Sequence, residues 1–417
     1  MNINRITENQ KKYAMQAELM KLYSQYGFRQ IAIPACESAA ALNELEKKYP
    51  VKSQVRFMDQ SGEIFHLQND PTLSVMKMLR FSQTRSNDEK ICYYAPTYKW
   101  SNGQLKEETQ IGIEAFGTDT ETYDLETIVL AIKSLRRFTE EVALDIGDVT
   151  LLSMLLKGIH LSEAQTNEVY KALPTKNVLR LQNLPEFYNL SDLIWEQLSA
   201  IFKLYGPQRR VIGDTRALLE TMTFETEATR AKAEKALKAL SDRATLLEAY
   251  QLESYVQLDL TLSPELPYYN GLVLKGFIGG CPSEVLTGGR YDKLSKDFGK
   301  AACAIGFALT LDNLMKYTEV KKMTRKNTLL LLENTLSAKG IEYAELYRQR
   351  GFEVNLRTYD AEKEAIEIAE AEQFEKVIVF QETTAKIIDI RKNDIQKVPY
   401  TTFENYLKIS EVERGIH

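Results

Sequence analysis

The chain has 417 residues, of which 44% are hydrophobic and 27% charged, and its formal net charge at pH 7 is -5. This length and composition are typical of a globular protein with two or three domains, and the net charge gives no support for a nucleic-acid partner. No stretch approaches the roughly 18 consecutive apolar residues of a membrane-spanning helix. The first residues lack the apolar core of a secretory signal, so we expect a cytosolic protein with no membrane span.

The cysteines and histidines are few and widely separated along the chain. They are Cys36, Cys92, Cys281 and Cys303, with His66, His160 and His417. No two cysteines form a C-x-x-C pair, which favours reduced thiols over a disulfide framework. The scattered histidines do not have the spacing of zinc ligands. We therefore expect neither a metal nor another cofactor.

Helices and strands are predicted to alternate in the first third of the chain. The two predicted helices cover residues 8–26, where Gly27 ends the first helix, and residues 124–142. Short strands and turns recur from about 55 to 117. The predicted strands are 28–35, a hairpin over 55–68 that turns at Ser61-Gly62, and the segments 90–100 and 109–117.

The middle of the chain, about 151–250, changes character. It has few strand signals, and residues 227–250 are strongly helix-forming, so we interpret this part as a helical insertion. Strands return at 255–262, 270–278 and 283–289, with a hairpin turn at Gly279-Gly280. Residues 304–317 begin with small side chains and continue as a helix.

After a charged linker at 321–327, the alternating pattern predicts a compact three-layer α/β domain of about ninety residues. Its predicted strands are 328–334, 352–359, 377–381 and 385–391, and its predicted helices are 336–351 and 360–376. The second of these helices carries seven carboxylates against two lysines. Such a surface would repel the phosphates of RNA.

Five segments resemble, in order, the motifs of histidyl-tRNA synthetases. They are YGFRQIAIP at 26–34, LQNDPT at 67–72, QIGIEAFG at 110–117, ELPYYNG at 265–271, and GGRYDKL at 288–294 followed by AIGFALTLDNL at 304–314. The resemblance implies an α+β fold with a class II synthetase-like antiparallel sheet core and flanking helices over 1–320. It also implies an anticodon-binding-like α/β domain over 327–417. Within the last motif, Gly288, Gly289 and Arg290 are expected to serve backbone geometry and packing.

Two groups of proteins share this pattern: the synthetases, and their non-catalytic paralogue, the regulatory subunit of ATP phosphoribosyltransferase. In the synthetases three arginines offset the charge of ATP, and each well-placed donor of this kind contributes roughly 3–4 kcal/mol. Here the three positions align with Lys99, Pro264 and Asn313, and the arginine of the family's L-R-P-E-x-T loop aligns with Gln68. The resemblance therefore implies a degenerate ATP site.

The amino-acid half of the synthetase site resembles the family more closely. Its residues are Asp70, Thr72, Gln110, Glu114, Tyr268 and Tyr269, which align with the positions that hold histidine. Gln110 and Glu114 are four residues apart on a predicted strand, so they share one face. Simpler interpretations stay open: a solvated sheet face for this pair, a turn for the Asp-Pro segment, and packing for the tyrosines. If the tyrosines lie in a strand, they face opposite ways and one of them lines the pocket.

The sequence has neither a G-x-x-x-x-G-K phosphate loop nor a phosphoribose-binding loop, so we expect transferase chemistry to lie on another chain. The resemblance then implies a non-catalytic regulatory subunit that activates the short-form catalytic subunit and mediates histidine feedback inhibition in the first step of histidine biosynthesis. It implies a homodimer, formed through residues 26–34, within a hetero-octamer, and no tRNA partner. A divergent histidyl-tRNA synthetase and a stand-alone histidine- or RNA-binding module stay open as alternatives.

Overall fold

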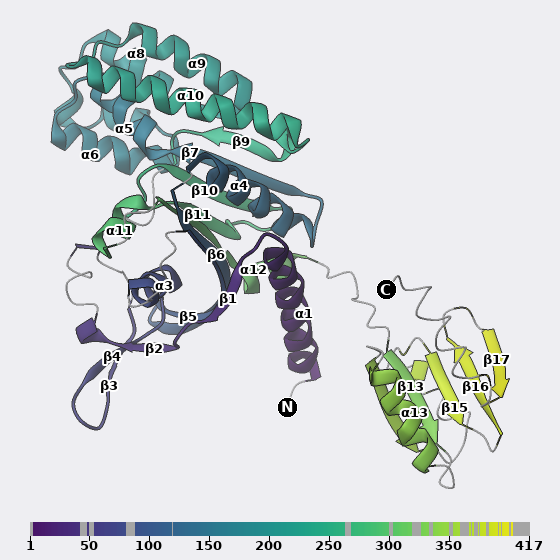
Figure 1. Ribbon diagram of the computed structural model, residues 1–417. Helices are drawn as coiled ribbons and strands as arrows, with labels where there is room; N and C mark the ends of the chain where they lie inside the picture. Colours follow the sequence, from purple (N-terminus) through teal and green to yellow (C-terminus); the bar gives the residue numbers. More distant parts are fainter. Residues whose placement is uncertain are drawn as a thin grey trace. The chain divides into compact units, whose positions relative to one another are not determined.

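The computed structural model describes most of the chain. The described residues are 3–41, 48–49, 54–80, 88–118, 120–262, 268–299, 303–318, 327–332, 337–349, 353–358, 367, 369–370, 374, 376–380, 383–390, 392, 394–399 and 402. The chain forms two compact units, Met1–Lys321 and Lys322–His417 (Figure 1). In the described part of the chain, no helix is long and apolar enough to cross a membrane.

The first unit is built on a nine-stranded, largely antiparallel sheet. Its spatial order is β1 (Arg29–Ala32), β5 (Glu89–Ser101), β6 (Gln104–Gly117), β12 (Cys303–Thr310), β11 (Leu286–Arg290), β10 (Leu272–Ile278), β7 (Val142–Asp148), β9 (Val256–Asp259) and β8 (Tyr205–Pro207). The pairs β1–β5 and β7–β9 are parallel. β5 and β6 form a long hairpin whose tip, Asn102-Gly103, has positive φ at both residues, which suits a two-residue hairpin turn.

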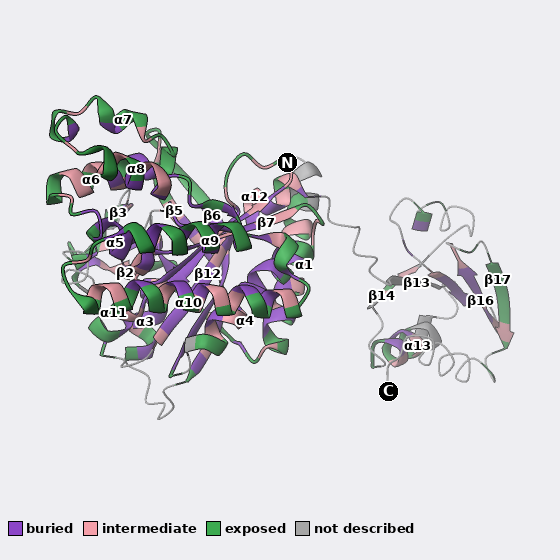
Figure 2. Cartoon of the chain, turned by 90° about the horizontal axis from the view of Figure 1, so that it is seen from above, coloured by how far each residue is buried: buried purple, intermediate pink, exposed green. Residues whose placement is uncertain are grey.

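Helices cover both faces of this sheet. One face packs against α1 (Ile3–Gln25), α4 (Thr120–Arg136) and α12 (Leu311–Tyr317), and the other packs against α3 (Pro71–Arg80) and α11 (Asp292–Asp297). Figure 2 shows buried strands beneath helices whose outer sides are exposed. Ile111, Ile113 and Ala115 of β6 enter the first core, whereas Phe116 joins Tyr93 of β5 in a second, aromatic core. The strand period of two therefore divides β6 between two environments.

Between β7 and β9 the chain is mainly helical. The helices are α5 (Val149–Lys157), α6 (Glu163–Ala172), α7 (Leu179–Gln182), α8 (Asp192–Ile201), α9 (Gln208–Thr221) and α10 (Glu227–Ala249), with 3₁₀ turns η2 (Leu173–Thr175), η3 (Pro185–Phe187) and η4 (Glu253–Tyr255). They gather beside β7 and β9 (Figure 1). Side chains cap the starts of α5, α6, α8 and α10. For example, Asp148 accepts from the Leu151 amide at 2.9 Å, and Ser162 forms a capping box with Gln165.

A small antiparallel sheet precedes α3. It contains β2 (Cys36–Ser38), β4 (Ile64–Leu67) and β3 (Arg56–Met58), and η1 (Ala39–Ala41) follows β2. β3 and β4 confirm the hairpin predicted over 55–68. The turn between them is held by Asp59, which accepts from the amides of Ser61 and Glu63, and Gly62 has a φ of 87°.

The second unit contains a five-stranded mixed sheet. Its order is β14 (Glu353–Thr358), β13 (Asn327–Leu332), β15 (Lys376–Phe380), β16 (Thr384–Asp389) and β17 (Asp394–Pro399). Ile378 and Phe380 pack with α13 (Ser337–Gln349) on one face, whereas Val377 and Val379 contact Phe374 on the other. Both faces thus carry buried apolar residues, as expected for a three-layer α/β unit. The helix predicted over 360–376 lies largely outside the described residues.

Three elements depart from the sequence-based prediction. The helix predicted over 124–142 ends at Arg136, and strand β7 begins at Val142. The first half of 304–317 is strand β12, and α3 lies within a region predicted as strands and turns. β7 and β12 are each flanked by strands on both sides, and this long-range pairing leaves little trace in a local pattern. The start of α3 did have a signal, since proline is favoured at the first helical position.

A buried ion-pair cluster joins the sheet, α4 and the helical insertion. Asp124 of α4 is 0% exposed, and one of its oxygens accepts two hydrogen bonds from Arg290 of β11, one of them at 3.1 Å. Its other oxygen pairs with Arg243 of α10. Arg290 also donates to Asp292 at 3.0 Å, and Asp292 accepts from the Ala304 amide. Arg290 therefore has a structural role, as expected, because it and Arg243 share Asp124 as a buried counter-ion.

We expect Asp124→Ala to lower the unfolding free energy of the first unit by about 3–5 kcal/mol, because two guanidinium groups lose their buried counter-ion. Trp100 and Trp195 both lie in this unit, so urea unfolding followed by tryptophan fluorescence reports it alone. Glu140→Ala removes the exposed partner of Arg136 and should cost under about 1 kcal/mol. Equal losses in the two variants would contradict a special role for Asp124.

Candidate functional site

Glu114 is the centre of a buried polar cluster on the α3 side of the sheet. Its side chain is 1% exposed. Thr72 Oγ1 donates to Glu114 Oε1 at 2.6 Å, and the Tyr291 hydroxyl donates to Oε2. Tyr93, on the adjacent strand β5, is buried in the aromatic core on this side of the sheet. Two internal hydroxyl groups therefore satisfy both oxygens of the Glu114 carboxyl group.

Two glycines make room for the cluster. Gly306 of β12 is the cross-strand partner of Glu114, and a Cβ there would lie 2.0 Å from Glu114 Oε2. Gly112 is the cross-strand partner of Tyr93, and a Cβ there would lie 2.5 Å from the Tyr93 hydroxyl. Neither distance is compatible with a real side chain, because atoms this close repel strongly. A side chain at either position would displace the carboxyl group or the phenol.

Asp70 provides a second buried carboxyl group, from the residue just before α3. Its Oδ1 accepts from the Leu73 amide at 3.4 Å, as a helix N-cap does, and Pro71 takes the first helical position. Its Oδ2 accepts from the Tyr268 hydroxyl at 2.9 Å. The start of α3 therefore positions both Asp70 and Thr72. The Asp-Pro segment thus begins a helix and does not form the isolated turn left open as a simpler interpretation.

Aromatic rings close the cluster. The ring centroids of Tyr268 and Tyr269 are 5.2 Å apart, and Tyr268 lies 6.1 Å from Tyr291 and 6.1 Å from Tyr49. Residues 268–270 do not form a strand, so the condition under which Tyr268 and Tyr269 would face opposite ways is not met. Gly289 of β11 admits the Tyr269 ring: a Cβ there would lie 2.9 Å from Tyr269 Cδ1.

Burial raises the pKa of both carboxyl groups. Desolvation raises the pKa of Glu114 to about 8; the nearby Asp70 adds to this effect, and the hydrogen bonds from Thr72 and Tyr291 oppose it. Burial also raises the pKa of Asp70, against the hydrogen bond from Tyr268. Within the described ranges, neither group forms an ion pair. A ligand with a positive charge would supply the missing counter-ion.

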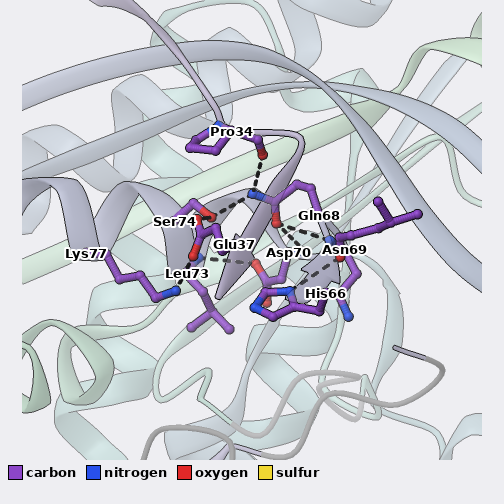
Figure 3. A network of polar contacts seen from close by, with 10 residues as sticks. Pro34, Glu37, His66, Gln68, Asn69, Asp70, Leu73, Ser74 and Lys77 are labelled. Atoms are coloured by element: carbon purple, nitrogen blue, oxygen red, sulfur yellow. Dashed lines mark hydrogen bonds and ion pairs between the residues drawn. The ribbon is translucent and has the colours of Figure 1, made fainter. Parts of the chain in front are cut away.

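Both polar atoms of the Gln68 side chain form hydrogen bonds within the protein (Figure 3). Its Nε2 donates to Ser74 Oγ at 2.6 Å and to the Pro34 carbonyl at 3.4 Å. Its Oε1 accepts from the amides of Asn69 and Asp70, at 3.0 and 3.2 Å. Gln68 therefore shapes the loop that carries Asp70, and its polar atoms are not directed at a phosphate.

Two of the other positions predicted as a degenerate ATP site, Lys99 and Asn313, lie in the described part of the chain. Lys99, near the tip of the β5–β6 hairpin, pairs with Glu108 at 2.7 Å. Asn313 is half-buried in the first turn of α12. Pro264 lies outside the described residues.

The structure brings most of the predicted pocket residues together. Those in one cluster are Asp70, Thr72, Glu114, Tyr268 and Tyr269. Gln110 is half-buried on the same face of β6 as Glu114, nearer the hairpin tip, opposite Ala95 and Thr310. Sequence reasoning missed Tyr93 and Tyr291. The GGRYD motif contained Tyr291, but nothing in the sequence indicates that its hydroxyl contacts Glu114.

The chemistry of the cluster suits a small ligand with an ammonium group and a flat ring. Two buried carboxyl groups can take the positive charge, and tyrosine rings can pack on the ring. In the ranges that the structure describes, no group of three His, Cys, Asp or Glu side chains is arranged to hold a metal ion.

We expect Glu114 to make the native chain less stable as pH rises from about 5 to 8. In this window native Glu114 keeps a proton that the unfolded chain has released, so the unfolding free energy falls with rising pH. Glu114→Gln lacks this titration. Across the window, its stability relative to the unsubstituted chain should therefore rise by on the order of 4 kcal/mol.

Urea unfolding at several pH values, followed by tryptophan fluorescence, measures this difference. Glu107→Gln is the matched control, since Glu107 is exposed on the same strand and should leave the pH profile unchanged. Parallel profiles for Glu114→Gln and the unsubstituted chain would show that Glu114 is ionised in the native state.

Comparisons with known proteins show which family the chain belongs to. The family model described as Histidyl-tRNA synthetase matches residues 6–314. A curated relative from Acetivibrio thermocellus is 27% identical over 357 residues, which cover 83% of this chain and 82% of that protein. Another, from Ruminiclostridium cellulolyticum, is 25% identical over 411 residues, covering 95% and 94%. Both relatives are named ATP phosphoribosyltransferase regulatory subunit.

Solved structures show the same fold. A Bacillus halodurans protein, described as an ATP phosphoribosyltransferase regulatory subunit/histidyl-tRNA synthetase, superposes with a TM-score of 0.73 at 25% identity, covering 89% of this chain and 94% of that one. Histidyl-tRNA synthetase from Nostoc sp. PCC 7120 gives a TM-score of 0.78 at 14% identity, covering 97% and 96%. The expected class II synthetase-like fold is therefore confirmed. The chain belongs to the histidyl-tRNA synthetase family.

Proposed function

We propose that this chain is the regulatory subunit of ATP phosphoribosyltransferase. In this role it activates the short-form catalytic subunit and transmits feedback inhibition by histidine, in the first step of histidine biosynthesis. The names of its curated relatives support this role. The observation that carries the proposal is a contrast on one sheet face. Glu114 and Asp70 form a buried acidic cluster with hydroxyl donors, whereas Lys99, at a position predicted to bind phosphate, is paired with Glu108.

The acidic pocket supports histidine as the ligand. Glu114 and Asp70 are buried without a positive partner in the described part of the chain, so an ammonium group or a protonated imidazole would stabilise their ionised forms. The rings of Tyr268 and Tyr269 offer a surface for the imidazole. Binding would then change the charge and hydrogen bonding at the start of α3. Differential binding of this kind is what couples two sites, typically by about 1–3 kcal/mol.

The described positions of the predicted ATP site support the absence of aminoacylation. Lys99 keeps a positive charge, but Glu108 neutralises it, and Gln68 is committed to the loop before α3. Asn313, which aligns with another arginine of the synthetases, carries no charge. Activation of an amino acid by ATP needs fixed positive groups at the developing negative charge, and each missing group costs roughly 3–4 kcal/mol.

Assembly follows the family pattern in this proposal. The chain forms a homodimer through residues 26–34, and dimers join the catalytic subunit in a hetero-octamer. The unit Lys322–His417 acts as an interaction domain and not as a tRNA-binding domain. The acidic composition of 360–376 supports the second point, since RNA binding requires neutralised phosphates.

A divergent histidyl-tRNA synthetase is the second candidate, favoured by the positive charge that Lys99 retains on the pocket face. ATP-dependent charging of tRNA by the purified chain would establish it. A stand-alone histidine-binding module would bind histidine but have no catalytic partner.

We expect the short-form catalytic subunit from the same organism to transfer phosphoribosyl groups at least about tenfold faster with this chain than without it, and histidine to reverse the gain. The measurement is the initial rate of transfer while histidine is titrated at a fixed ratio of the two chains. Size-exclusion chromatography of the mixture shows whether they form a complex. Absence of both activation and a complex would overturn the proposal, and tRNA charging would then decide between the alternatives.

We expect Glu114→Gln to raise the histidine concentration for half-inhibition by about 10- to 100-fold, because the ligand loses a charged hydrogen-bond partner. Activation by this variant should persist, since Glu114 is buried away from the surface. Glu107→Gln on the same strand is the control and should behave as the unsubstituted chain does. If Glu114→Gln keeps its normal histidine response, the histidine sensor lies elsewhere and the regulatory role itself still stands.

A further inference from the structure

Two lysines oppose each other near the tip of the β5–β6 hairpin. Lys99 of β5 and Lys106 of β6 are direct cross-strand partners, so their side chains leave the sheet on the same face. This is the face that carries Gln110 and Glu114, because residues two apart on a strand share a face. Like charges directly opposite each other destabilise a strand pair unless an anion lies between them.

Glu108 supplies that anion from within the chain. It is two residues from Lys106 on the same face, and its carboxylate lies 2.7 Å from Lys99 Nζ and 2.6 Å from Lys106 Nζ. The Glu108 side chain is 10% exposed, whereas the two lysines are 50% and 52% exposed. Burial raises the pKa of Glu108, but the hydrogen bonds from both lysines outweigh it and hold the pKa below its usual value. The carboxylate is therefore ionised and enclosed between two ammonium groups.

We propose that Glu108 is a built-in counter-ion that occupies an anion site of this chain and excludes polyphosphate ligands from it. Two lysines on one pocket face form a phosphate-binding pair, since each ammonium group can donate to a phosphate oxygen. The Glu108 carboxylate already takes those donors, and it would repel an incoming polyphosphate. The face is thereby selective: its deep end, at Glu114, accepts a positive group, and its hairpin end rejects a multiply negative one.

An ordinary surface salt bridge does not explain this arrangement. Exposed pairs contribute little because both side chains stay mobile and hydrated. Glu108 contacts two lysines at once and is more buried than either. Its neighbour Glu107 is exposed and lies on the opposite face of the strand, so the two residues differ in placement but not in charge.

The test is direct binding of sodium tripolyphosphate and of ATP, each titrated calorimetrically into the full-length chain at low ionic strength. Glu108→Gln keeps nearly the same shape but frees both lysines, and it should bind both ligands about tenfold tighter than the unsubstituted chain. Glu107→Gln removes the same charge from the other face and should bind as the unsubstituted chain does. The double variant Lys99→Met with Glu108→Gln should lose the gain.

The proposal is overturned if Glu108→Gln binds no tighter than the unsubstituted chain, or if Glu107→Gln gains as much, which would show a general charge effect. Tight binding of tripolyphosphate by the unsubstituted chain would also overturn it. The experiment measures binding by the isolated chain and does not depend on the catalytic subunit. A negative result would therefore leave the proposed regulatory role intact. Disproof of the regulatory role would likewise leave the proposal for Glu108 intact.

Discussion

The structure depends on strand β6 facing two environments at once. Its odd-numbered residues, including Ile111 and Ile113, enter the main core against α1 and α4, whereas Gly112 and Glu114 face the aromatic cluster. A period of two enforces this division, and a shift of one residue in register would place a carboxyl group in the main core. Register is fixed on both sides of β6, by the hairpin with β5 and by pairing with β12. The pocket can therefore hold a polar centre without disturbing the core behind it.

Keeping Glu114 buried in this way is costly. A carboxyl group without a positive partner is destabilised by desolvation, and the structure limits the cost with two hydroxyl donors and a raised pKa. Gly306 is needed for the same reason, since any side chain there would occupy the position of Glu114 Oε2. A cation bound beside Glu114 would stabilise its ionised form, as the proposed function requires.

The sequence predicted the fold well where patterns are local or motifs are shared. Helix α1, the β3–β4 hairpin and the class II-like core all appeared where expected. Strands β7 and β12 were missed because their stability comes from neighbours on both sides, which belong to distant segments. The aligned motifs contained most residues of the acidic cluster, but they did not single out Tyr93 and Tyr291. Tyr93 has room in the cluster because its cross-strand partner is Gly112, and Tyr291 contacts Glu114 through its hydroxyl group. Neither feature can be recognised from the spacing of residues in the sequence.

Glu114 and Glu108 lie at two ends of one sheet face, and their ionised forms differ in stability because their hydrogen-bond and ion-pair partners differ. At the deep end, the partners of Glu114 among the described residues are hydroxyl donors, so its ionised form is disfavoured. At the hairpin end, Glu108 lies between two lysines, so its ionised form is stable. Six residues, roughly 20 Å of extended strand, separate them. The positions of two glutamates relative to the lysines thus give the two ends of this face opposite electrostatic character. Such a difference requires no change of fold, because it depends only on which side chains stand at neighbouring positions of one hairpin.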